Sequence, residues 1–190
     1  MRAMTTRNTT SRTAATPAPT AQHVSAGRRV AYYGVLAAAA LVCGYLEMLV
    51  PLPTTVPGIK LGLGNAVVLL ALTWIGPRAA LTIMLVKVIA STLLFANLQM
   101  LAFSLAGGLL SWGVMALAHR SELFSTVVTS VLGGLAHNVG QLIMVAALLS
   151  SQVAVVNAPV LAVAGVLCGA AVGIVVQLIL RSLPTGAVHA

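Results

Sequence analysis

Acidic residues are almost missing from this sequence. Its 190 residues include 10 Lys and Arg but two acids, Glu47 and Glu122, and there is no Asp. Only 6% of the residues are charged, whereas about a quarter are charged in a typical soluble domain, so the composition excludes a chain that is soluble by itself. Without Asp there is also no aspartate-rich motif to hold Mg²⁺ and a diphosphate, which argues against catalysis of that kind.

Other features of enzymes and metalloproteins are missing as well. His119 and His137 are eighteen residues apart, which is not a zinc-ligand spacing. The Gly-Leu-Gly stretch that starts at residue 62 is not followed by the Gly-Lys-Ser/Thr of a phosphate-binding loop. Cys43 and Cys168 lie within apolar runs, where buried thiols are commoner than a disulfide. We therefore expect no metal site, no cofactor and no enzymatic activity.

Apolar residues dominate what is present. They make up 59% of the chain, and the mean hydropathy is +1.05. A helix needs about 20 apolar residues to cross a bilayer, and the run at 61–75 is short for this but could begin within the membrane. The predicted spans are 30–50, 61–75, 79–96, 98–118, 123–149 and 158–180. The sequence thus predicts an all-α, polytopic membrane protein with six transmembrane helices.

The membrane domain is expected at 30–181, between two tails. Residues 1–29 are rich in Thr, Ala, Pro and Arg, contain no acid, and cannot bury a core, so they are predicted to form a disordered basic tail. The paired arginines before residue 30 are not read as part of a signal peptide, because the apolar run that follows is too long for one. Residues 182–190 form a short C-terminal tail.

Positive charges indicate the orientation. With six spans, the arginines at the predicted helix ends all fall on one side, which the positive-inside rule assigns to the cytoplasm. These residues are Arg28, Arg29, Arg78, Arg120 and Arg181. The opposite side carries Lys60 alone. We therefore expect a multi-pass protein of the cell membrane with both termini in the cytoplasm, and basic residues placed for a bilayer rather than for nucleic acid.

The stretch PLPTTVPGIKLGLGN, residues 51–65, joins the first two apolar runs. Its prolines restrict the backbone, and its glycines allow close backbone approach. Lys60 stands just before a predicted helix start, where free amide groups favour an anion. One interpretation is a ligand-covering loop with an anion site at the outer mouth. The other is a tight turn with a lysine that snorkels to the interface.

Polar residues inside the predicted spans are the remaining candidates. Ionisable groups are costly there and often functional, whereas His, Asn and Gln also serve simply to join helices by hydrogen bonds. That second explanation suits Asn138 and Gln177, but Lys87 carries a charge that such contacts do not need. The candidate substrate-binding residues are Glu47, Lys60, Asn65, Lys87, His137 and Gln141.

Small residues recur four apart in the first run. The pairs are Gly34 with Ala38 and Ala40 with Gly44. Such spacing lets a second helix approach closely. The pattern fits packing within the chain, and it also fits docking to another membrane protein.

Four segments together carry a resemblance to a known family. They are PGIKLGLGNAVVLLAL, GPRAAL with Lys87 after it, FSLAGGLLSWGVMAL and VLGGLAHNVGQL. In this order, over about residues 30–180, they resemble the Gx transporter family, often labelled heptaprenyl diphosphate synthase component I. That family is similar to the S-components of energy-coupling-factor vitamin transporters, which have six helices, cytoplasmic termini and an outward pocket covered by the loop after the first helix.

The resemblance implies a membrane-embedded substrate-binding subunit for uptake of a small, anionic or amphipathic molecule. Its partners would be that ligand, the lipid bilayer, and an energy-coupling transmembrane subunit with ATPases, docked through the small residues of the first helix. The alternative is a non-catalytic membrane accessory component of heptaprenyl diphosphate synthesis, beside a soluble subunit that carries the aspartate-rich motifs.

In the uptake interpretation each candidate has a role. Lys60 and the start of the second helix attract an acidic group, while Asn65 and Gln141 provide neutral hydrogen bonds. Lys87 and His137 line the deep end. Glu47 pairs with Lys60 or with Lys87.

Overall fold

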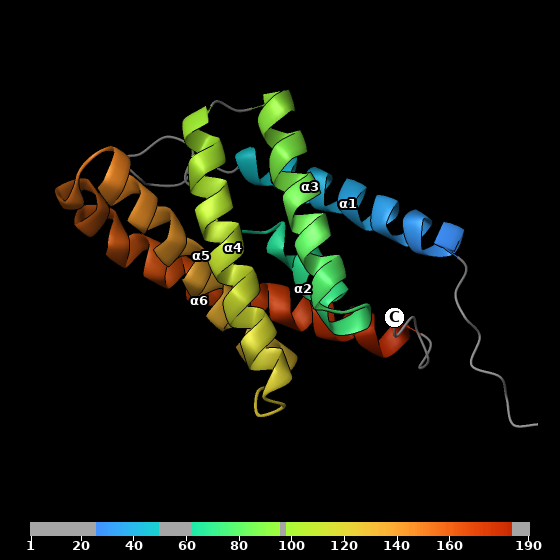
Figure 1. The fold of residues 1–190 in the computed structure, drawn as a ribbon. Helices are drawn as coiled ribbons and strands as arrows, with labels where there is room; N and C mark the ends of the chain where they lie inside the picture. The colour runs from blue at the N-terminus through green and yellow to red at the C-terminus, as the bar shows by residue number, and fades with distance from the viewer. Residues whose placement is uncertain (1–25, 50–61, 96–97, 184–190) are drawn as a thin grey trace, which may run out of the picture.

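A computed structural model describes residues 26–49, 62–95 and 98–183, which form six α-helices without any strand (Figure 1). The helices are α1 Ala26–Met48, α2 Asn65–Trp74, α3 Pro77–Phe95, α4 Leu98–Arg120, α5 Thr126–Leu148 and α6 Ser151–Ser182. The all-α prediction is confirmed. Lys60 and most of both predicted tails lie outside the described residues.

Five of these helices are long and apolar enough to cross a membrane, in keeping with a multi-pass membrane protein. The exception is α2, whose 10 residues extend about 15 Å, or about half of a hydrocarbon core. The helix starts late because Gly62 has a positive φ of 86°, and the Asn65 N–H then bonds to the Gly62 carbonyl at 2.8 Å. The predicted span at 61–75 is therefore a half-length helix.

The last helix is longer than the predicted 158–180. It begins at Ser151 and includes Pro159. The Ser150 hydroxyl accepts a hydrogen bond from the Val153 N–H at 3.2 Å, so an N-cap starts the helix seven residues early. The predicted break between the spans 123–149 and 158–180 is therefore wrong over residues 151–157, which are helical.

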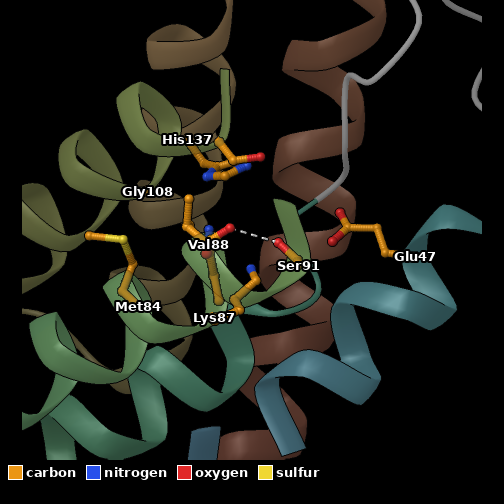
Figure 2. A pocket seen from close by; sticks show the side chains of 9 residues that line it. Glu47, Met84, Lys87, Val88, Ser91, Gly108 and His137 are labelled. Carbon is orange, nitrogen blue, oxygen red and sulfur yellow. Dashed lines mark hydrogen bonds between the residues drawn. The ribbon is translucent and has the colours of Figure 1, made fainter. Parts of the chain in front are cut away.

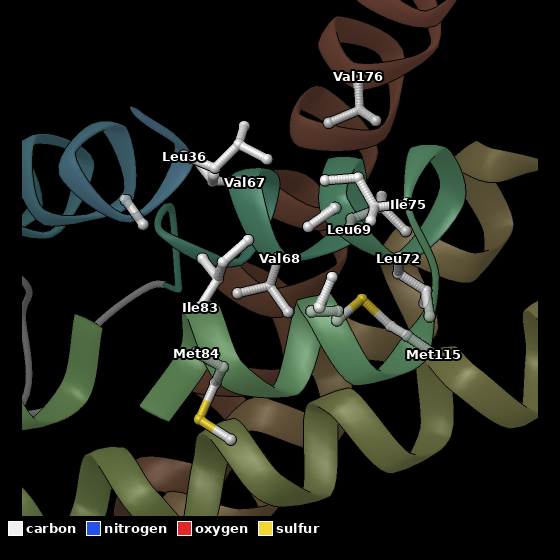
Figure 3. Close-up of a cluster of buried hydrophobic side chains, with 14 of the residues drawn as sticks. Leu36, Val67, Val68, Leu69, Leu72, Ile75, Ile83, Met84, Met115 and Val176 are labelled. Carbon is white, nitrogen blue, oxygen red and sulfur yellow. The ribbon is translucent and has the colours of Figure 1, made fainter. Parts of the chain in front are cut away.

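The short helix α2 is the centre of the bundle, since it contacts each of the other five helices. Its buried side chains, among them Val68, Leu69 and Leu72, are packed between residues of α1, α3, α4 and α6 (Figure 3). A helix that is apolar on all sides suits this surrounded position. By contrast, among the described helices α1 contacts only α2 and α3, and it lies at the edge of the bundle (Figure 1).

Glycines bring α4, α5 and α6 close together. A Cβ atom at Gly140 on α5 would lie 2.5 Å from the Ala106 carbonyl oxygen of α4. At Gly134, also on α5, a Cβ would lie 2.6 Å from the Gly165 carbonyl oxygen of α6. These backbones are in contact, as small residues allow in membrane helices, so the three helices form a tight layer beside α2.

The arginine-bearing helix ends at Arg78 and Arg120 lie at the same end of the bundle, since both residues line one hollow. The Trp112 indole N–H, eight residues before Arg120 on α4, donates to the Pro77 carbonyl at 2.9 Å and joins α4 to the first residue of α3. This grouping is the one that the charge pattern predicts. The side of the membrane that it faces stays a prediction.

Labelling of single cysteines tests that orientation. In a background with Cys43 and Cys168 replaced by alanine, we expect Arg78→Cys and Arg120→Cys to react with a membrane-impermeant maleimide only after the cells are permeabilised. Ser151→Cys, at the opposite end of the predicted topology, is the control and should react in intact cells. Labelling of Arg78→Cys in intact cells would reverse the orientation.

Candidate functional site

A small polar cavity lies inside the bundle, lined by residues of five helices (Figure 2). Its polar lining residues, all buried, are Glu47 on α1, Asn65 on α2, Lys87 and Ser91 on α3, Ser104 on α4 and His137 on α5. The cavity has a free volume of about 10 Å³, which is room for about one water molecule. The fold thus brings together four of the six predicted binding residues.

Lys87 lies in the middle of α3 and is only 8% exposed. Its side chain runs past two glycines. A Cβ atom at Gly64 would collide with the Lys87 Nζ and lie 2.5 Å from its Cε, and one at Gly44 would lie 3.6 Å from the Cε. The glycine just before α2 therefore provides the space that the lysine occupies.

Glu47 is near the end of α1 and is 4% exposed. Its Oε1 accepts a hydrogen bond from the Gly62 N–H, which links α1 to the start of the α2 segment. Its Oε2 is buried and has no hydrogen-bond partner in the described part of the chain. The predicted pairing with Lys60 concerns a residue outside that part, whereas Lys87 lines the same cavity as Glu47.

The His137 imidazole ring has close neighbours on two sides. Its Nε2 lies 2.8 Å from the Nε2 of Gln141, one turn further along α5. On the other side, a Cβ atom at Gly107 would lie 2.9 Å from the ring Nδ1. Gln141 is fully buried and does not line the cavity, so in this arrangement it orients the imidazole. The ligand contact predicted for Gln141 remains a prediction.

Asn65 joins this cavity to a second one of similar size. Its Nδ2 donates to the Ser111 hydroxyl on α4 at 3.2 Å. Asn138, the neighbour of His137, instead donates from Nδ2 to the Leu161 carbonyl on α6 at 2.6 Å. That bond joins two helices, as the packing interpretation predicts for this residue.

Three serines belong to the site although they were not among the sequence candidates. Ser91 and Ser104 line the cavity, and Ser111 holds Asn65. Their positions in the sequence could have identified them as candidates. Ser91 follows Lys87 by four residues, and Ser104 and Ser111 are seven apart, so each pair lies on one helical face.

The small residues of α1 divide between two faces. Ala40 is fully buried in the apolar core, and Gly44 packs against Lys87. Gly34 and Ala38 are exposed, and a Cβ at Gly34 would meet open space. The Ala40 and Gly44 edge is therefore internal packing, and the docking hypothesis rests on Gly34 and Ala38 alone.

The chain was compared with known proteins. No curated protein and no solved structure matches it. The family model described as heptaprenyl diphosphate synthase component I matches residues 36–179, about three quarters of the chain. The matched part contains the whole polar cavity and every helix except the first residues of α1 and the last residues of α6. The protein therefore belongs to the heptaprenyl diphosphate synthase component I family.

Proposed function

We propose that the protein is a substrate-binding subunit of the cell membrane, with both termini in the cytoplasm, that serves the uptake of a small anionic or amphipathic molecule. The observation that carries the proposal is the cavity in which Lys87, His137 and Glu47 are buried together. Burying three ionisable side chains inside a membrane bundle is costly, and such groups commonly mark a substrate or ion pathway.

The start of α2 supports the same function. Gly62 to Gly64 precede the helix and are not helical, yet Gly62 and Gly64 are buried beside His137 and Lys87. Irregular backbone at membrane depth is tolerated where it is enclosed by protein or lines a cavity. Helices that start near the middle of the membrane form the binding sites of many transporters, with their N-terminal amide groups directed at an anionic substrate.

Lys87 gives the site its selectivity for an acidic group. A carboxylate or phosphate would accept a charge-assisted hydrogen bond from the ammonium group, and His137 would add a second polar contact. Glu47 and Lys87 line the same closed cavity, and in this proposal the carboxylate balances the charge of the ammonium group. A bound anion would take over this role, and Glu47 would move away because like charges repel in a medium of low dielectric constant.

Binding requires the cavity to open. Small-molecule sites usually measure about 300–1,000 Å³, far more than the 10 Å³ found here. Helix α1 is the mobile wall in this proposal, since among the described helices it contacts only α2 and α3. Opening breaks the bond between Glu47 and Gly62 and exposes Lys87. The predicted docking of Gly34 and Ala38 to an energy-coupling subunit would act on this same helix.

Replacing Lys87 tests the proposal. Wild-type protein purified in mild detergent is expected to retain a small acidic molecule that native mass spectrometry detects as an adduct. In Lys87→Met this adduct should bind about ten- to a hundredfold more weakly, because one charge-assisted hydrogen bond contributes about 1.5–3 kcal/mol.

Asn157→Leu is the matched control, since Asn157 is also a buried polar residue but lines no part of the cavity. It should keep the adduct. If native mass spectrometry finds no adduct, binding is measured instead by the shift in unfolding temperature with a panel of small carboxylates and with farnesyl diphosphate. A ligand that binds wild type and Lys87→Met equally would refute the proposed site.

The family description favours one alternative, a non-catalytic accessory component of heptaprenyl diphosphate synthesis. The sequence has no Asp and thus no aspartate-rich motif to hold Mg²⁺ and a diphosphate, so in this alternative a partner subunit carries that motif. This alternative predicts copurification of a soluble prenyl diphosphate synthase whose heptaprenyl product falls when the membrane protein is removed. The uptake proposal predicts no such dependence.

A further inference from the structure

A second, larger hollow lies between α3 and α4 at the arginine-bearing end. Its volume is about 740 Å³, within the usual range for sites that bind small molecules. Most of its wall is apolar and includes Leu72, Leu81, Trp112 and Leu117. It shares no lining residue with the polar cavity, so its role is independent of the function proposed above.

The rim of this hollow is positively charged. Arg78 and Arg120 both line it and are exposed, and neither forms an ion pair with another residue in the described ranges. Among the described residues that line the hollow, Glu122 is the one that is acidic, and His119 precedes Arg120 in the chain. Two arginines against one carboxylate leave a net positive charge, which matches a ligand with a single negative charge.

The depth of the hollow indicates the kind of ligand. Leu81 and Leu117 lie inside the apolar spans Pro77–Leu94 and Leu98–Arg120, whereas Arg78 and Arg120 are at the ends of those spans. In a bilayer the arginines would therefore lie at the level of the headgroups, and the apolar wall at the level of the acyl chains. The Trp112 indole N–H donates to the Pro77 carbonyl, which places this aromatic part of the wall beside the start of α3.

We propose that this hollow binds an anionic phospholipid. The phosphate accepts hydrogen bonds from Arg78 and Arg120, and one acyl chain lies against the apolar wall. Basic pockets between transmembrane helices bind anionic lipid headgroups in this way. A free phosphate ion would contact only the arginines of the rim and not the apolar wall. A phospholipid matches both the rim and the wall.

The test is a titration of the full-length protein in detergent, followed by native mass spectrometry. Dioleoyl phosphatidylglycerol is the probe, with phosphatidylcholine of the same chains as the neutral comparison. We expect the double variant Arg78→Gln/Arg120→Gln to bind phosphatidylglycerol at least about tenfold more weakly than wild type. Arg181→Gln, which removes an exposed arginine outside the hollow, should bind like wild type.

A second variant tests the apolar part. A Cβ at Gly113 in the hollow meets nothing within 4 Å, so Gly113→Leu should fold and occupy the space of the acyl chain. It should weaken phosphatidylglycerol binding, whereas Gly34→Leu, at an equally open position on α1, should not.

Three results would overturn the proposal. The first is unchanged phosphatidylglycerol affinity in both the double arginine variant and Gly113→Leu. The second is equal affinity for phosphatidylcholine or for inorganic phosphate. The third is tighter binding of farnesyl diphosphate than of phosphatidylglycerol, which would assign the hollow to a phosphorylated isoprenoid.

Discussion

Gly140→Val should yield no folded protein in the membrane fraction. A Cβ atom at this position would lie 2.5 Å from the Ala106 carbonyl oxygen and 2.8 Å from the Gly107 Cα. Both are backbone atoms of α4, so the clash is relieved only if the two helices separate. Overpacking a core commonly costs about 1–3 kcal/mol. Parting a helix pair that relies on close backbone contact costs more, because the packing along the whole interface is lost.

The measurement is the yield of monodisperse protein after detergent extraction, together with its thermal unfolding temperature. Gly34→Val is the control, since a Cβ there meets open space, and it should retain the wild-type yield. Gly140→Ala should fall between the two, with a lower unfolding temperature than wild type. A Gly140→Val protein with wild-type yield and unfolding temperature would contradict the close contact between α4 and α5.

Gly64→Leu should abolish retention of the small acidic ligand and leave the protein folded. The new side chain would occupy the place of the Lys87 Nζ and Cε. The lysine end is flexible and can move aside, unlike the backbone at Gly140. The backbone at Gly64 also tolerates the change, because its φ of −62° and ψ of −14° are open to any L-residue. Lys87 would still be present, but its ammonium group would no longer face the ligand.

Native mass spectrometry of the ligand adduct and the unfolding temperature without ligand together measure this effect. Gly64→Ala is the milder variant and should weaken retention while keeping the fold. If Gly64→Leu and Gly64→Ala both retain the ligand at wild-type level, Lys87 does not contact it. The two glycine predictions thus separate the packing of the bundle from the geometry of the site.

Several features of the protein follow from local sequence. The long apolar runs form helices, because backbone N–H and C=O groups in lipid must make their hydrogen bonds within their own segment. The runs are broken by Gly76-Pro77 and by the residues after Arg120. Lys87, Glu47 and His137 were identified as candidates because ionisable residues are expensive at those positions. Their identification needed no knowledge of which helices are neighbours.

The structure was needed to show how the elements meet. Only the packing shows that the half-length α2 lies at the centre, that Ala40 and Gly44 face inward while Gly34 and Ala38 face outward, and that Gln141 holds His137. The physical reason is that lipid and a membrane protein's interior are both apolar. Hydrophobic periodicity, which separates core from surface in water, therefore does not separate buried from lipid-facing sides here. Which glycine makes room for which side chain depends on contacts between residues distant in the chain, such as Gly64 with Lys87 and Gly107 with His137.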